Sequence, residues 1–116
     1  MITATDTISA YIECALWASV DDDGDPLDSN PAELAPETIT RMHADVAAFA
    51  VNCADLDLSD LDPAQIGHDL WLTRNHHGAG FWDRGLGTLG DTLTERADAM
   101  GECDLYIGDD GLIYAA

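Results

Sequence analysis

Apolar residues recur at helical spacing in the N-terminal half of the chain and predict two helices. The first is capped by Asp6 and ends near Ser19, and the second runs from Pro36, a residue suited to the first helical position, to about Asn52. The predicted buried face of the first helix comprises Ile8, Tyr11, Ile12, Ala15 and Leu16. That of the second comprises Ile39, Met42, Val46, Phe49, Ala50 and Cys53.

Two acidic segments flank the second predicted helix. Residues 20–35 hold two prolines, a glycine and many acids, which predicts an exposed loop. In residues 55–62, DLDLSDLD, acids and leucines alternate as in a short strand. The like charges favour a loop instead, held in place by its leucines, and residues 63–67 could add one helical turn.

The segment from His68 predicts a β-hairpin. HDLWLTR, residues 68–74, alternates polar and apolar side chains as a half-buried strand does. Residues 75–78 have turn chemistry, and residues 80–84 could return antiparallel. In this arrangement Trp71 and Trp82 would stack across the two strands.

The C-terminal third predicts one helix and a second hairpin. The buried face of the helix would be Leu89, Leu93, Ala97 and Met100, and Gly101 would end it. Residues 105–107 and 112–114 would pair around a turn whose last residue, Gly111, suits a left-handed conformation. The chain is therefore predicted to be a single α+β domain, residues 1–116. Its order would be two helices, a hairpin, a helix and a hairpin, with the helices packed on one face of a small antiparallel sheet.

Composition narrows the possible partners. The 116 residues include 23 acids, four arginines and no lysine, for a formal net charge of −19. Such a charge repels nucleic acid and anionic membrane but attracts basic protein surfaces. No basic leader or membrane-length apolar run is present, so a cytoplasmic protein is expected, of undetermined oligomeric state. The spacing of Cys14, Cys53 and Cys103 favours buried thiols over a disulfide framework or a zinc site.

The charge is unevenly distributed along the chain. Residues 1–65 carry 14 acids and one arginine, whereas residues 66–96 carry four acids, three arginines and three of the four histidines. Aromatic, arginine and histidine side chains together are typical of a protein interface. The same side chains could instead stabilise the hairpin, with Arg74 or Arg84 forming an ion pair with Asp69 or Asp83 at its edge. The candidate binding residues of this near-neutral segment are His68, Trp71, Arg74, His77, Phe81, Trp82, Asp83 and Arg84.

Specific chemistries find weaker support. A metal could take ligands from His68, Asp69, His76, His77 and Asp83, but no metal-binding spacing is present. A histidine base lacks a persuasive nucleophile, and a nucleotide site lacks lysine. In DDDGD, residues 21–25, the acids resemble the start of a calcium loop, but Pro26 and Ala32 break that pattern. We therefore expect no cofactor and no metal, and an enzyme is the less favoured class.

Two segments carry a resemblance to a known family. With HDLWLTRNHHGAGFWDRG at 68–85 and DLYIGDDGLIY at 104–114, the chain resembles small proteins encoded by tailed bacteriophages and prophages. The resemblance extends to YIECALWASVDDDGDPLD and to APETI, and so covers most of the chain. It implies an accessory phage product in host cytoplasm, a setting where small proteins often inhibit host or defence machinery. It also implies a small or variable residue at position 76, which favours a role for His77 over His76.

The leading hypothesis is an inhibitor that mimics DNA. Carboxylates on a protein surface can imitate phosphate charge and occupy the basic surface of a host or defence nucleic-acid-binding protein. Two alternatives stay open: a halophile-adapted acidic domain of other function, and a His/Asp-centred enzyme or metal protein at residues 68–85. The residues expected to form the mimic surface are Asp21, Asp22, Asp23, Asp25, Asp28, Asp55, Asp57, Asp60 and Asp62.

Overall fold

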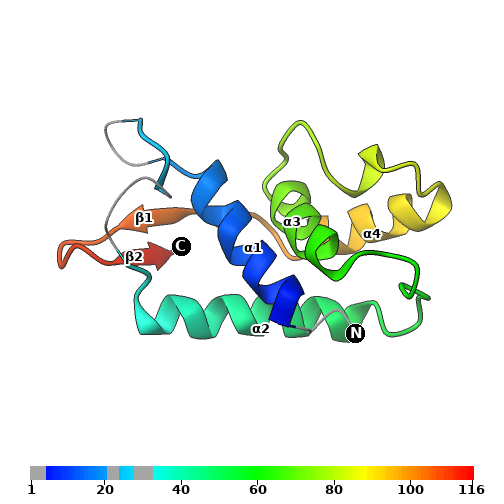
Figure 1. The fold of residues 1–116 in the computed structure, drawn as a ribbon, viewed down its shortest axis with the longest axis horizontal. Coiled ribbons are helices and arrows are strands. Elements are labelled where there is room, and N and C mark those ends of the chain that lie inside the picture. The colour runs from blue at the N-terminus through cyan, green and yellow to red at the C-terminus, as the bar shows by residue number, and fades with distance from the viewer. Residues whose placement is uncertain (1–4, 21–23, 28–32) are drawn as a thin grey trace.

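The computed structural model describes residues 5–20, 24–27 and 33–116, and shows an α+β fold (Figure 1). Within these residues it contains four α-helices, a short 3₁₀ helix and a two-stranded sheet. In chain order the elements are α1 (Thr5–Ala18), α2 (Pro36–Asn52), α3 (Pro63–Arg74), η2 (Phe81–Asp83), α4 (Thr88–Asp98), β1 (Leu105–Ile107) and β2 (Ile113–Ala115).

Helix α1 packs closely against α3, and Figure 1 shows it crossing in front of α2. A glycine permits this approach, because a Cβ atom on Gly67 of α3 would lie 2.0 Å from the carbonyl oxygen of Thr7. Asp6 does not precede the helix as predicted but is its second residue. At this position the positive end of the helix dipole stabilises its negatively charged carboxylate. The helix ends at Ala18, one residue before the predicted end.

Helix α2 has the predicted bounds. Ala35 is extended and Pro36 takes the first helical position without a side-chain cap. The prediction that Ile39 is buried is wrong, since 40% of it is exposed. Its neighbour Thr38 takes the buried position and donates its hydroxyl hydrogen to the carbonyl oxygen of Ile113 at 2.9 Å.

Residues 63–74 form helix α3, so the predicted hairpin over 68–84 is wrong. Residues 63–67 are helical as predicted, but they are the start of this longer helix instead of a single turn. Asp62 caps the helix, its side chain accepting a hydrogen bond from the Ala64 amide at 3.2 Å. From Ile66 to Arg74 every residue except His68 is buried. A helix enclosed on nearly all sides has no polar stripe, and the buried Asp69, Thr73 and Arg74 made its sequence resemble an alternating strand.

The C-terminal hairpin is confirmed, although β2 begins and ends one residue later than expected. Strands β1 and β2 are antiparallel, with Tyr106 opposite Tyr114, and Gly111 in the turn has φ 84°. Residues 33–35 bind along β2, because the Ala35 amide donates to Ile113 at 3.0 Å and the Ile113 amide to Glu33 at 2.8 Å. The sheet therefore lies at the start of α2, and helix-to-helix packing builds most of the core, instead of all helices covering one sheet face (Figure 1).

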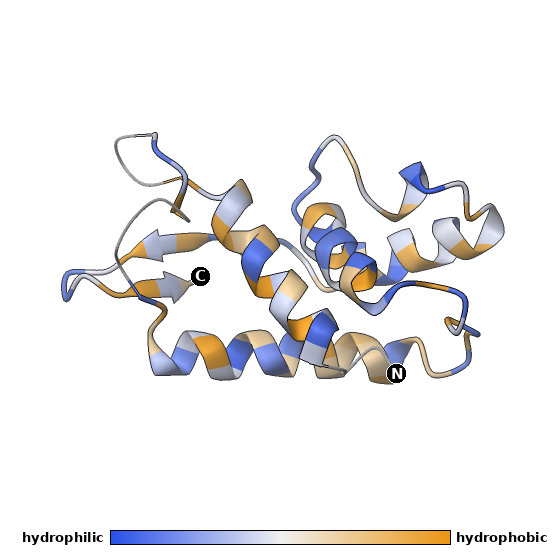
Figure 2. Cartoon of the chain, viewed as in Figure 1, coloured by the Kyte–Doolittle hydropathy of each residue, from blue (hydrophilic) through white to orange (hydrophobic). Residues whose placement is uncertain are grey.

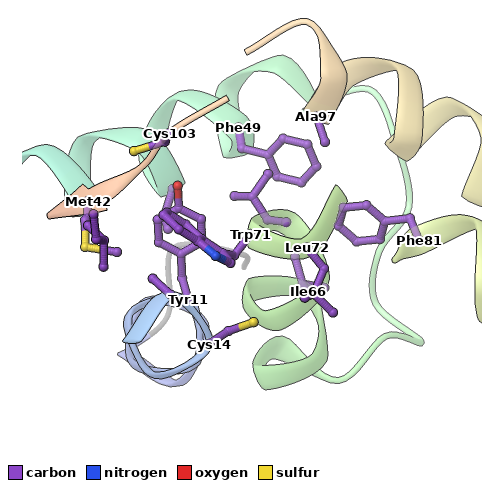
Figure 3. Close-up of a cluster of buried hydrophobic side chains, with 14 of the residues drawn as sticks. Tyr11, Cys14, Met42, Phe49, Ile66, Trp71, Leu72, Phe81, Ala97 and Cys103 are labelled. Carbon is purple, nitrogen blue, oxygen red and sulfur yellow. The ribbon is translucent and has the colours of Figure 1, made fainter. Parts of the chain in front are cut away.

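The buried apolar side chains form one cluster between the helices (Figure 3). Trp71 meets Tyr11 edge to face at 5.6 Å, and Phe49 stacks on Phe81 at 5.7 Å between ring centroids. The three cysteines are free and buried, as predicted. Leu56, Leu58 and Leu61 fix the 55–62 loop to this core, also as predicted. Among the described residues no helix is long and apolar enough to span a bilayer.

Candidate functional site

The candidate binding residues of the near-neutral segment divide into a buried and a surface group. Trp71, Arg74 and Phe81 lie in the core. The predicted stacking of Trp71 on Trp82 is wrong, because Trp71 contacts Tyr11 in the core and 45% of Trp82 is exposed. The surface group consists of His68, His77, Trp82, Asp83 and Arg84, of which His68 and His77 are half-buried.

Arg74 joins three parts of the chain in the interior. Its Nη1 donates to the Tyr11 hydroxyl at 2.8 Å and to Asp45 Oδ2 at 3.1 Å. Its Nε and Nη2 donate to the carbonyl oxygens of Gly101 and Met100, at 2.8 and 3.2 Å. Burial raises the pKa of Tyr11, so its hydroxyl stays protonated beside the guanidinium. This geometry assigns Arg74 to fold stability, with Asp45 as partner in place of Asp69 or Asp83.

Arg84 forms an ion pair with Asp69, one of the pairs predicted from the sequence. Arg84 Nη2 and Nε lie 2.8 and 3.1 Å from Asp69 Oδ1, and Gln65 Nε2 donates to the same oxygen at 2.9 Å. The Asp69 carboxylate is buried on the side of α3, and these hydrogen bonds compensate for its lost hydration. The hydrogen bonds from Arg84 to Asp69 raise the pKa of the guanidinium.

A shallow hollow of about 550 Å³ lies beside this ion pair, between α1 and α3. Its lining includes Glu13, Trp17, His68 and Arg84, and the ring centroids of Trp17 and His68 are 6.4 Å apart. Trp17 is 61% exposed. Trp17 lies off the apolar face of the predicted helix, which is a sequence signal for this surface, but it is not among the predicted binding residues.

The hollow offers polar and aromatic contacts but little nucleophilic chemistry. Cys14 also lines it, yet burial raises the pKa of that thiol to about 12. The thiol is therefore protonated at neutral pH, and the thiolate is the nucleophilic form. His68 Nδ1 is buried 3.9 Å from Asp69 Oδ1 and has no hydrogen-bond partner among the residues that the structure describes. These contacts suit recognition of a polar group better than covalent catalysis.

The two adjacent histidines follow α3 in a turn. His76 has φ 57°, a left-handed backbone conformation that glycine adopts most easily. The phage resemblance likewise implies a small or variable residue at this position. Its Nδ1 and Nε2 lie 3.8 Å from Asp98 and 3.7 Å from Glu102, so a protonated ring would be attracted to both carboxylates. In the part of the chain that the structure describes, no group of three His, Cys, Asp or Glu side chains is arranged to hold a metal ion.

The acidic residues proposed for mimicry lie on the surface wherever they are described. Asp25, Asp55, Asp57, Asp60 and Asp62 are exposed, while Asp21, Asp22, Asp23 and Asp28 lie outside the described residues. Asp57 accepts hydrogen bonds from the Ser59 amide and hydroxyl, which lower the pKa of its carboxyl. Asp55 pairs with Arg96, whose hydrogen bonds likewise lower the pKa of that carboxyl.

All four arginines of the chain donate hydrogen bonds to the chain itself. Arg74, Arg84 and Arg96 pair with carboxylates, and the exposed Arg41 donates to the carbonyl oxygen of Ala115 at 3.3 Å. Every described acidic residue except Asp45 and Asp69 is exposed. The chain has no lysine, so its cations cannot balance the outward carboxylates.

A second hollow is apolar and was not anticipated from the sequence. It is a groove of about 710 Å³ between the C-terminal half of α2 and the 55–62 loop. Val51, at 74% exposure, is the most exposed large apolar side chain described, and it lines this groove. The leucines that alternate with acids in the loop are the sequence signal for this groove, although their pattern predicts only that they anchor the loop. The other apolar lining residues are Ala47, Ala50, Cys53, Ala54, Leu56, Leu58, Leu61, Pro63 and Ile66.

Comparisons with known proteins supply no further assignment. No family model, curated protein or solved structure matches the chain. The resemblance to phage-encoded proteins therefore stays an expectation based on the quoted motifs.

Proposed function

We propose that this protein binds the basic, nucleic-acid-binding surface of another protein and inhibits it by mimicking DNA. The distribution of charge supports this proposal, because the arginines are engaged within the chain while the carboxylates face outward. A surface of this kind attracts Lys- and Arg-rich grooves and repels nucleic acid itself. The phage resemblance makes a host or defence protein the expected partner and host cytoplasm the expected location.

Helix α4 presents a regular row of carboxylates. Asp91, Glu95 and Asp98 are all exposed and occupy positions i, i+4 and i+7, which lie on one face of a helix. With an axial rise of about 1.5 Å per residue, neighbouring carboxylates are about 5 Å apart along the axis. This spacing is of the same order as the rise per phosphate of one strand along the axis of duplex DNA, about 3.4 Å. We therefore take this row as one contact of the mimic surface.

The first test is capture of partners from host lysate at about 50 mM and about 500 mM salt, followed by competition with duplex DNA. A captured nucleic-acid-binding protein that is lost at high salt and displaced by DNA would support mimicry. A captured partner that ignores both salt and DNA would contradict it.

A charge-neutralised variant then tests the α4 row. Asp91→Asn/Glu95→Gln/Asp98→Asn should weaken binding of the captured partner by about 10-fold or more, because three carboxylates are removed from one face. The matched control, Glu37→Gln/Asp104→Asn/Asp109→Asn, removes the same charge near the hairpin at the other end of the molecule (Figure 1). Equal losses in both variants would show that net charge alone matters and that α4 is not a contact.

A further inference from the structure

The apolar groove beside α2 is an unusual feature on so acidic a surface. In Figure 2 the C-terminal half of α2 is mostly in hydrophobic shades, whereas hydrophilic positions interrupt its first half. The 55–62 loop folds back beside this end of the helix and supplies Leu56, Leu58 and Leu61 to the groove. The groove has a volume of about 710 Å³.

Carboxylates flank the same groove. Asp57 and Asp60 alternate along the loop with the groove leucines and are exposed. Asp60 and Asp62 line a smaller adjoining hollow that shares Leu61 and Ile66 with the groove. An apolar floor with an anionic rim complements a segment that combines apolar residues on one side with Lys or Arg at its edges.

Charge argues against other occupants. A second copy of this chain would bring another net charge of −19 to the acidic rim, and nucleic acid would bring phosphates. Addition of an extended peptide to a sheet edge is also unsuited to this place, because β1 and β2 lie at the opposite end of α2 (Figure 1).

We propose that this groove binds a basic amphipathic helix of a protein partner. The inference rests on the proposed function, since it takes the partner to be basic, and it adds that recognition includes an apolar face. The apolar side chains of the partner helix, spaced at i, i+3, i+4 and i+7, contact Val51 and the loop leucines. Its lysines or arginines lie against Asp57 and Asp60.

The test uses two fluorescein-labelled peptides made of leucine and lysine in equal composition. In one the leucines fall on a single helical face, and in the other their order is scrambled. We expect the amphipathic peptide to bind about 10-fold or more tightly than its scrambled isomer at about 150 mM salt, measured by fluorescence anisotropy. Amide chemical shifts should change most at residues 47–58.

Two matched pairs of variants locate the contact. Val51→Ser should weaken the amphipathic peptide by about 10-fold, because it removes apolar surface from the groove. Ile39→Ser, an exposed apolar position of the same helix outside the groove, should leave affinity unchanged. Asp60→Asn should weaken binding more than Asp109→Asn, which removes the same charge in the hairpin turn.

The outcomes separate the groove from the general acidic surface. Order-dependent binding that Val51→Ser removes and Ile39→Ser leaves intact supports the groove. Equal binding of both isomers, absence of binding by either, or equal effects of Val51→Ser and Ile39→Ser would overturn it. The DNA-mimic function is judged independently, by salt and DNA competition on the captured partner, so failure of the groove does not decide that question.

Discussion

Three polar side chains of α3 are buried because each is bonded to another part of the chain. Asp69 accepts hydrogen bonds from Arg84 and Gln65, and the hydroxyl oxygen of Thr73 accepts a hydrogen bond from the Phe81 amide at 3.1 Å. Arg74 reaches Tyr11, Asp45 and the 100–101 turn. Buried polar groups without such partners would destabilise the fold, so these side chains fix how α3 sits among its neighbours.

Loss of the Arg74 side chain should be costly. Arg74→Ala leaves Asp45 and two carbonyl oxygens without their cationic partner, and breaking a buried ion pair typically costs about 3–5 kcal/mol. Arg41→Ala serves as the control, because this exposed side chain donates to one carbonyl oxygen and its loss should cost about 0.5 kcal/mol or less. Urea denaturation measures both, and similar losses in the two variants would refute a structural role for the buried network.

At the scale of elements, the contact between α1 and α3 depends on a missing side chain. In Gly67→Ala the added Cβ would lie 2.0 Å from the Thr7 carbonyl oxygen, so α1 must move away. We expect a loss of about 1–3 kcal/mol in the free energy of unfolding, as for other overpacked contacts. Gly78→Ala is the control, because no described atom lies within 4 Å of its Cβ position and its φ is outside the left-handed region. Equal denaturation midpoints for both variants would contradict the close approach.

The contrast between α2 and α3 shows how far sequence pattern predicts elements. Helix α2 has one solvent face, so its apolar period and Pro36 predicted its bounds. Helix α3 is enclosed by α1, α4 and η2, and its polar residues are buried, so its period gave no helical signal. The C-terminal hairpin was predictable because its turn residues, including Gly111, act locally.

The candidate surface was predictable only in part, because burial depends on tertiary neighbours. The Arg84–Asp69 pair was among the predicted pairs. Nothing local distinguishes Trp71, buried against Tyr11, from Trp82, which is 45% exposed. The groove is formed by the C-terminal half of α2 and the 55–62 loop, and the sequence pattern of either segment alone does not show that they meet.

For the whole molecule, self-repulsion acts over its full size at low salt. The described chain extends 42 × 25 × 22 Å, and the Debye length falls from about 30 Å at 0.01 M to about 3 Å at 1 M salt. We expect the Tm to rise steadily across this range while the protein stays folded throughout, as monitored by circular dichroism. Sucrose at matched osmolality, which does not screen charge, is the control for general solute effects.

The same titration separates mimicry from salt adaptation. If the protein is folded at about 0.05 M salt, its core stabilises the native state despite the repulsion between its carboxylates. Its acidic surface is then not explained by a need for stability in concentrated salt and is available for binding a partner. Unfolding below about 1 M salt would instead indicate a halophile-adapted surface and contradict the function proposed here.

The internal use of all four arginines has a consequence for how an encounter with a partner proceeds. A surface without a competing basic patch draws a cationic partner inward from many directions, but it exerts little torque to turn that partner into one pose. The acidic surface therefore accelerates association with a cationic partner but does not by itself determine the orientation in which the partner binds. If the protein acts as proposed above, we expect its exposed uncharged surfaces, Trp17 on α1 and the groove around Val51, to select a single final orientation from many encounter states.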